Sequence, residues 1–173
     1  GEILLPDLFS PIPDHVLNGA KSTAKILGSV QAHGLPFSEG VLPLANKVED
    51  QLVANTYKPA LEIIGIEGIP DLENAGNVLR DKIKVALSFR LPPDVDPMVA
   101  ASAVKSELVS DPPFGAQIRI EIDSLASGWA APKLSEWIQK SFEQSSKVYF
   151  GRDYQVMGEG GTIPFMAMLG EKY

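Results

Sequence analysis

Two segments in which apolar residues alternate with charged or small ones constrain the fold of this chain most. Every second residue is apolar in residues 82–90, and isoleucine alternates with charged side chains in residues 117–123. Such an alternation places one face of a strand on a core and the other face toward solvent. We therefore predict two half-buried strands, and we expect Arg90, at the end of the first strand, to point away from the core.

Further signals around these two segments predict an α+β fold. Residues 61–66 are rich in β-branched side chains and predict a third strand. The pair Asp96 and Pro97 is typical of a helix start, because the aspartate caps free amides and proline fits the first turn. The predicted order of strand, strand, helix and strand is similar to the last four elements of a ferredoxin-like unit, an antiparallel sheet with helices on one face.

Helical signals also lie on both sides of this unit. Asp14 could cap a helix that stops at Gly28. The remaining predicted elements are an extended lead-in over 1–13, a loop over 31–43, and helices over 46–54, 132–151 and from 163 to the last residue. In the helix over 132–151 we expect the apolar side chains to be buried: Leu134, Trp137, Ile138 and Phe142. Trp129 and Trp137 are predicted to serve in core or interface packing.

Composition excludes several classes of function. The formal charge of -7 and the lack of a concentrated basic surface argue against a nucleic-acid partner. No apolar run approaches the roughly 20 residues that span a bilayer, and the first residues do not have the order of a signal peptide. We predict a soluble, cytoplasmic protein that binds no membrane, although the absence of cysteine leaves the compartment open by itself. That absence excludes disulfides, thiolate metal sites and a cysteine nucleophile.

The segment GEGGTIP, residues 158–164, is the most informative local motif. Glycines allow a sharp turn, and Thr162 can cap the helix that follows. The amides of Gly160, Gly161, Thr162 and Ile163 could then converge on an anion near a helix N-terminus. A glycine-rich turn before a capped helix, without any ligand, is the alternative that the motif leaves open.

Three motifs in order resemble a known enzyme family. The segment GNVLRDKIKVALSFRLPPDVDP, residues 76–97, is followed by GWAAPKL, residues 128–134, and by MGEGGTIPFMAMLGEKY, residues 157–173. Together they resemble the M20 zinc metallopeptidases, which include dipeptidases, carnosinase-like enzymes and desuccinylase-type amidohydrolases. The resemblance is good over residues 56–173 and loose over residues 1–55. It implies a lid, or dimerisation, domain over 56–127, a segment of an α/β catalytic domain over 128–173, and a helical and loop lead-in over 1–55.

The resemblance also implies roles for particular residues. Asn77 would reach across a homodimer to the partner's substrate, and Arg90 would bind the substrate carboxylate. Backbone amides and a hydroxyl of the glycine motif would receive the substrate, which assigns Glu159, Gly160, Gly161 and Thr162 to substrate binding. Read from the residues alone, Asn77 beside Gly76 is equally a turn residue, Arg90 a solvated strand end, and Glu159 a solvated loop acid. Gly158 replaces an arginine found in many dipeptidases of the group, which weakens a strict dipeptidase assignment.

The three motifs that carry the resemblance contain none of the family's metal ligands. The family holds two zinc ions with histidine and acidic ligands, whereas this chain has only His15 and His33, each without a ligand-spaced partner. We predict no metal ligand and no catalytic residue in this chain, and zinc in the intact enzyme. The predicted function is part of a metal-dependent peptidase or amidohydrolase acting on a peptide or N-acyl amino acid. The alternative is a non-catalytic ferredoxin-like dimerisation or ligand-binding module.

Overall fold

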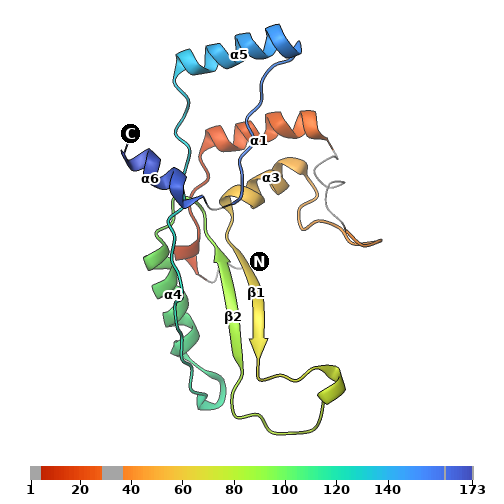
Figure 1. The fold of residues 1–173 in the computed structure, drawn as a ribbon, viewed down its shortest axis with the longest axis vertical. Coiled ribbons are helices and arrows are strands. Elements are labelled where there is room, and N and C mark those ends of the chain that lie inside the picture. The colour runs from red at the N-terminus through yellow and green to blue at the C-terminus, as the bar shows by residue number, and fades with distance from the viewer. Residues whose placement is uncertain (1–4, 29–36, 162, 173) are drawn as a thin grey trace.

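The computed structural model describes residues 5–28, 37–161 and 163–172. Its longer elements, in chain order, are α1 (Asp14–Leu27), α3 (Val48–Tyr57), β1 (Ala60–Glu67), β2 (Lys84–Arg90), α4 (Pro97–Ser110), α5 (Glu136–Phe150) and α6 (Pro164–Lys172). Three 3₁₀ turns complete the described elements: η1 (Pro6–Leu8), η2 (Leu72–Asn74) and η3 (Pro113–Gly115). The described residues form a two-stranded sheet with α4 beside it and α1, α3 and α5 beyond one end of it (Figure 1). The predicted α+β class is confirmed, and the predicted lead-in and loop fall partly on residues 1–4 and 29–36, outside the described residues.

β1 and β2 form an antiparallel hairpin. Its register runs from Ala60 opposite Arg90 to Glu67 opposite Lys84, with a bulge between Ile63 and Gly65. An ion pair of 3.2 Å joins Lys84 to Glu67 at the end of the ladder. The strands predicted over residues 61–66 and 82–90 are therefore confirmed, and residues 68–83 form the long connection at one end of the hairpin (Figure 1).

The prediction that one face of β2 lies on a core is wrong. The apolar side chains of Ile83, Val85 and Leu87 are 53%, 47% and 38% exposed. The reason is that none of the described helices packs extensively against either strand. The alternation marks a face that is suited to burial, but no layer of the described chain covers it.

The prediction of a strand over residues 117–123 is also wrong. This segment is irregular, and within the described residues the sheet consists of β1 and β2 alone. A strand requires a neighbour that takes its backbone N–H and C=O groups, and here no described segment pairs with residues 117–123. The ferredoxin-like sheet with helices on one face is therefore not formed by the described residues.

Cap residues explain where the helices begin and end. Asp96 caps α4 as predicted, and its carboxylate accepts hydrogen bonds from the amides of Met98, at 2.7 Å, and Val99, at 3.4 Å. Gly28 ends α1 as predicted, with a φ of 52°. The prediction that Asp14 caps α1 is wrong, because Pro13 holds the cap position and Asp14 lies in the first turn. An acid there still interacts favourably with the helix dipole.

α5 lies apart from the other elements at the top of Figure 1 and ends at Gly151 in the left-handed conformation. The predicted burial of its apolar residues is wrong, since Trp137 and Phe142 are 72% and 48% exposed, and Leu134 and Ile138 are half-buried. Phe142 makes an edge-on contact with Tyr154, with ring centroids 5.7 Å apart. An amphipathic helix buries its apolar stripe only where another element covers it, and that cover is absent among the described residues.

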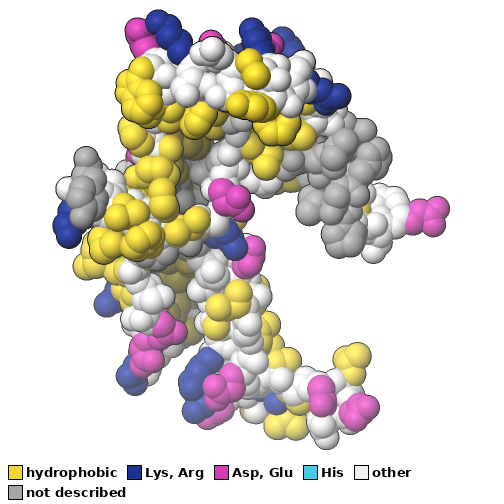
Figure 2. Space-filling view, turned by 45° about the horizontal axis from the view of Figure 1, so that its top comes forward, with side chains coloured by type: hydrophobic (Ala, Val, Ile, Leu, Met, Phe, Trp, Pro, Cys, Tyr) yellow, Lys and Arg dark blue, Asp and Glu magenta, His cyan; other side chains and the backbone are white. Residues whose placement is uncertain are grey.

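The best-packed region is the contact between α1 and α3. Thr23 and Ala24 of α1 are buried there together with Leu52 and Val53 of α3. Elsewhere burial is sparse, and the accessible surface of 14075 Å² compares with about 8,200 Å² for a typical folded monomer of this mass. Figure 2 accordingly shows hydrophobic side chains gathered on the visible face. Among the described residues no helix combines the length and the apolar character needed to cross a membrane.

Candidate functional site

The glycine loop, residues 158–161, lies against the C-terminal end of α3. A Cβ added to Gly160 would overlap the backbone carbonyl oxygen of Asn55, and a Cβ added to Gly158 would lie 2.7 Å from Cγ2 of Thr56. Only glycine permits backbone to approach so closely. The structure thus gives these two glycines a packing role that the sequence motif did not reveal.

α1 holds the segment that leads into this loop. The Thr23 hydroxyl donates a hydrogen bond of 3.0 Å to the backbone carbonyl oxygen of Val156. The neighbouring Ser22 hydroxyl donates one of 3.0 Å to Oε1 of Gln155. Figure 1 shows the chain between α5 and α6 passing both α1 and α3. Two helices from the start of the chain therefore fix a loop that is more than 100 residues later in the sequence.

Arg90, at the end of β2, reaches the same loop. Its Nη1 donates a hydrogen bond of 3.1 Å to the carbonyl oxygen of Gly160. The Arg90 side chain is exposed, and a guanidinium carries five N–H donors. The remaining donors are geometrically suited to a carboxylate, which an arginine can bind through two parallel hydrogen bonds. The structure brings together Arg90 and Gly160, two of the residues that the sequence predicted as one site.

The other residues of the loop are open to solvent. Glu159 and Gly161 are exposed, and α6 begins at Pro164, three residues after Gly161. The amides of Gly160 and Gly161 donate no hydrogen bond to any described residue. Thr162 lies outside the described residues. Two amides without an acceptor among the described residues, the Glu159 carboxylate and the end of the Arg90 side chain thus all lie at this exposed loop.

Asn77 is not part of this cluster. It is exposed and belongs to the connection beyond the far end of the hairpin. The ladder between that end and Arg90 spans the seven residues of β2, which is about 20 Å at 3.3 Å per residue. Within one copy of the chain, Asn77 and Arg90 therefore cannot contact the same small molecule.

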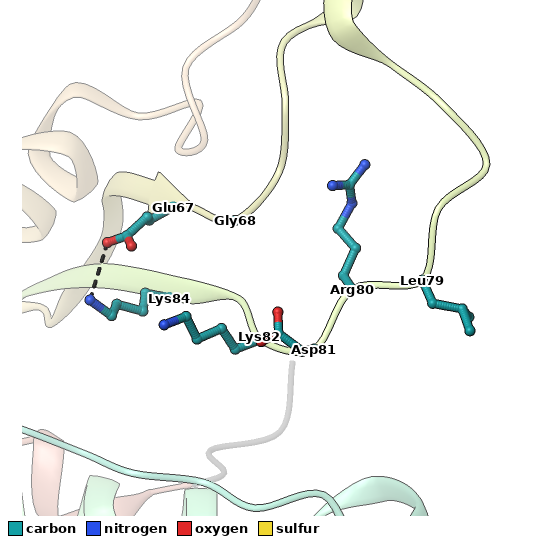
Figure 3. Close-up of a pocket in the computed structure, with 7 residues that line it drawn as sticks. All are labelled: Glu67, Gly68, Leu79, Arg80, Asp81, Lys82 and Lys84. Carbon is teal, nitrogen blue, oxygen red and sulfur yellow. Dashed lines mark hydrogen bonds and ion pairs between the residues drawn. The ribbon is translucent and has the colours of Figure 1, made fainter.

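A hollow of about 150 Å³ lies at the far end of the hairpin (Figure 3). Figure 3 shows Lys84 turned toward Glu67 and Arg80 pointing away from them. Three basic and two acidic side chains line it together with Gly68 and Leu79: Arg80, Lys82, Lys84, Glu67 and Asp81. The charges nearly balance, and the hollow lies at the opposite end of β2 from Arg90, so it is separate from the candidate site.

Comparison with known proteins matches this fold to peptidases. No family model and no curated protein matches the sequence. Solved structures do match, and among them are human carnosine dipeptidase 1, with 21% identity and a TM-score of 0.68; the di-peptidase Dug1p of Saccharomyces cerevisiae, with 23% and 0.65; and the M20 family metallo-carboxypeptidase Sso-CP2 of Sulfolobus solfataricus, with 19% and 0.59. The chain has the fold of a segment of these peptidases. The resemblance to M20 metallopeptidases is confirmed at the level of the fold.

The extent of the match is unequal on the two sides. The three alignments cover 98–99% of this chain but only 36%, 36% and 39% of the peptidase chains. The match includes residues 1–55, where the sequence resemblance was loose. The domain boundaries at 55 and 127 stay predictions.

The donor set for a metal does not occur among the described residues. They contain no group of three or more histidine, cysteine, aspartate or glutamate side chains that could hold an ion. His15 is exposed on α1, and His33 lies outside the described residues. The residues present therefore do not fit the two-zinc centre that the M20 resemblance implies, which needs several converging nitrogen or oxygen ligands.

Sequence reasoning missed the residues that support the loop. Thr23 of α1 holds Val156 just before the loop, and Asn55 and Thr56 of α3 contact the loop itself. The next residue, Tyr57, has a raised pKa because it is partly buried and because the carboxylate of Asp94 lies near it. A helical threonine or asparagine carries no local signal of such a role, since its partner is far away in the sequence. The role of these residues becomes visible only when the folded structure brings α1, α3 and the glycine loop together.

Proposed function

We propose that this chain supplies substrate-binding and dimerisation elements of a metal-dependent peptidase or amidohydrolase that cleaves a peptide or N-acyl amide bond. The observation that carries the proposal is the hydrogen bond from Arg90 to Gly160, which brings a guanidinium to an exposed glycine loop. A fold similar to a segment of three peptidases supports it. Because the chain spans little more than a third of those structures, the proposal concerns the intact protein.

In this proposal the free donors of Arg90 bind the carboxylate of the substrate. A planar guanidinium recognises a carboxylate through two parallel hydrogen bonds, which fixes its orientation. The amides of Gly160 and Gly161 and the hydroxyl of Thr162 complete the contacts, near the positive end of α6. Glu159 contacts an amino group of the substrate. These residues hold the substrate and exchange no proton with it.

Zinc is the metal proposed for the intact enzyme, where it would activate a water molecule for attack on the amide carbonyl. Its ligands would come from outside the described residues, and the chain's own residues only bind and orient the substrate. Metal-dependent turnover is therefore expected of the intact enzyme and not of this chain alone.

Dimerisation is the second element of the proposal. Asn77 lies too far from Arg90 to share its ligand, so it would serve the site of a second copy. Both strands of the described sheet have an edge without a strand partner, and unpaired strand edges favour association. A homodimer formed through this region would also cover apolar side chains that are now exposed, such as Ile63 and Ile64.

A titration of the ¹⁵N-labelled chain tests the carboxylate site. N-acetylalanine should shift the resonances of Gly160, Gly161 and the Arg90 side chain, whereas N-acetylalanine amide, which lacks the carboxylate, should not. Arg90→Gln should abolish the response, because it removes the cation. Arg152→Gln, the same change at an exposed arginine just beyond α5, is the matched control and should retain it. Equal shifts with the amide, or an unchanged response in Arg90→Gln, would contradict the proposal.

A further inference from the structure

Most of the buried residues that the structure describes lie in the contact between α1 and α3. Thr23 is only 5% exposed, and Val53, in the adjoining helix, is also 5% exposed. Both belong to the α1–α3 contact. α3 contacts the loop through Asn55 and Thr56, and α1 binds Val156, two residues before the loop, through Thr23. The loop therefore rests on the part of the molecule that is best fixed by its own packing.

The hydroxyl of Thr23 is directed in an unusual way for a helical threonine. A threonine within a helix usually bonds to the carbonyl oxygen three or four residues earlier, and Thr56 does so, with 2.9 Å to the carbonyl oxygen of Leu52. Thr23 instead donates to Val156, 133 residues later. A buried hydroxyl that bonds outside its own helix ties two distant segments together.

We propose that Thr23 is a positioning residue for the glycine loop. Its hydroxyl fixes the backbone at Val156, two residues before Gly158, and the contacts of Gly158 and Gly160 with α3 fix the loop itself. Together they determine where the carbonyl oxygen of Gly160 meets the Arg90 guanidinium. α1 and α3 are then a structural part of the candidate site, and α1 is not only a lead-in. The effect on ligand binding rests on the proposed function, whereas the effect on loop geometry does not.

Amide ¹⁵N relaxation of the 173-residue chain tests the geometry. Thr23→Val keeps the shape of the side chain and removes the donor. We expect the order parameters of residues 155–161 to fall below about 0.6, the range of flexible backbone, while those of α1 and α3 stay unchanged. Thr23→Ser retains the hydroxyl and should keep the order parameters of the wild type. Ser22→Ala removes only the exposed bond to Gln155 and should have a smaller effect.

The same variants in the N-acetylalanine titration test the consequence for binding. Thr23→Val should weaken binding at least threefold, and Thr23→Ser should bind like the wild type. Unchanged order parameters in residues 155–161, or an equal fall in Thr23→Ser, would overturn the proposal. So would a uniform fall across α1, α3 and the loop, which would make Thr23 an ordinary core residue. If the wild-type chain binds no ligand but the relaxation results hold, the proposed function fails and the positioning role stands.

Discussion

The α1–α3 helix pair and the β1–β2 hairpin differ in how far they bury their own apolar side chains. In the helix pair, apolar side chains of two helices meet each other, so Ala24, Leu52 and Val53 are buried by the chain itself. In the hairpin the two strands pair along their length apart from the bulge between Ile63 and Gly65, yet Ile63 and Ile66 are 62% and 54% exposed. Backbone hydrogen bonds and the Lys84–Glu67 ion pair join the hairpin, whereas burial stabilises the helix pair.

This difference indicates where the chain can hold a functional group accurately. A two-stranded hairpin is only marginally stable without a covering layer, so Asn77 on its long connection depends on partners for its position. The glycine loop rests on the helix pair, which needs no partner to be packed. Arg90 lies where the two regions meet, at the end of the hairpin that contacts the loop.

The largest expected effect comes from truncating a buried side chain of the helix pair. Leu52→Ala should lower the free energy of unfolding by about 2–4 kcal/mol, because it removes buried methyl groups and leaves a cavity. Ile64→Ala is the matched change in the hairpin. Ile64 lies at the bulge and is 66% exposed, so its truncation should cost about 0.5 kcal/mol or less. Urea unfolding followed by circular dichroism measures both, and equal losses would remove the contrast between the two regions.

The next effect separates two adjacent glycines of the loop. Gly160→Ala should destabilise the chain by about 1–3 kcal/mol, since the new methyl group overlaps the backbone of Asn55 and forces a shift of packed atoms. Gly161→Ala meets open space and should change the stability by less than about 1 kcal/mol. Gly160→Ala should also break the hydrogen bond to Arg90. A shift of the Arg90 side-chain resonance in Gly160→Ala alone is the expected readout, and an equal response in Gly161→Ala would contradict the close contact with α3.

The next prediction concerns self-association through the exposed apolar side chains of the hairpin. Sedimentation velocity over a range of concentrations should show that the chain self-associates, and Ile64→Lys should weaken the association about tenfold, since burial of an isoleucine contributes about 1.5 kcal/mol or more. Val148→Lys, an equally exposed position on α5 with 68% exposure, is the control. If both variants weaken association to the same degree, the hairpin is not the surface that associates.

Local signals in the sequence were sufficient for most elements. The Asp96 and Pro97 pair locates the start of α4, and the alternation in residues 82–90 locates β2, because these features depend only on neighbouring residues. Arg90 and Gly160 were predicted to share a site through the family resemblance, and the structure places them in contact. The α1 boundary was also correct at Gly28, although the capping residue was not.

The failures concern features that need a second segment. Residues 117–123 have the pattern of a strand, but a pattern does not provide the neighbour that completes a ladder. Trp137 and Phe142 have the spacing of a buried stripe, but no described element covers α5. Thr23 acts on Val156 across 133 residues, and nothing near Thr23 in the sequence indicates that partner. In each case the sequence does not indicate which segment, if any, lies opposite the residue.

The smallest expected effect concerns Tyr57, which links the helix pair to the end of the hairpin. Its pKa is raised from 10.0, first because the phenol is partly buried and second because of the negative charge of Asp94. A raised pKa means that the folded state keeps the phenol proton after the unfolded state begins to lose it. The stability that this proton contributes is therefore complete below about pH 10 and is lost as the pH rises through the folded pKa.

Unfolding by urea at pH 7, 9, 10 and 11 should reveal this in two variants. Tyr57→Phe removes the titrating group, so its stability should fall less steeply than that of the wild type above about pH 10. Asp94→Asn removes the second cause of the shift and should lie between them. Tyr149→Phe, at a tyrosine of α5 that is 79% exposed, should follow the wild type. If Tyr57→Phe also follows the wild type at high pH, the phenol is solvated. The end of α3 would then be as open as the hairpin, and the distinction between a packed and an uncovered region would not hold there.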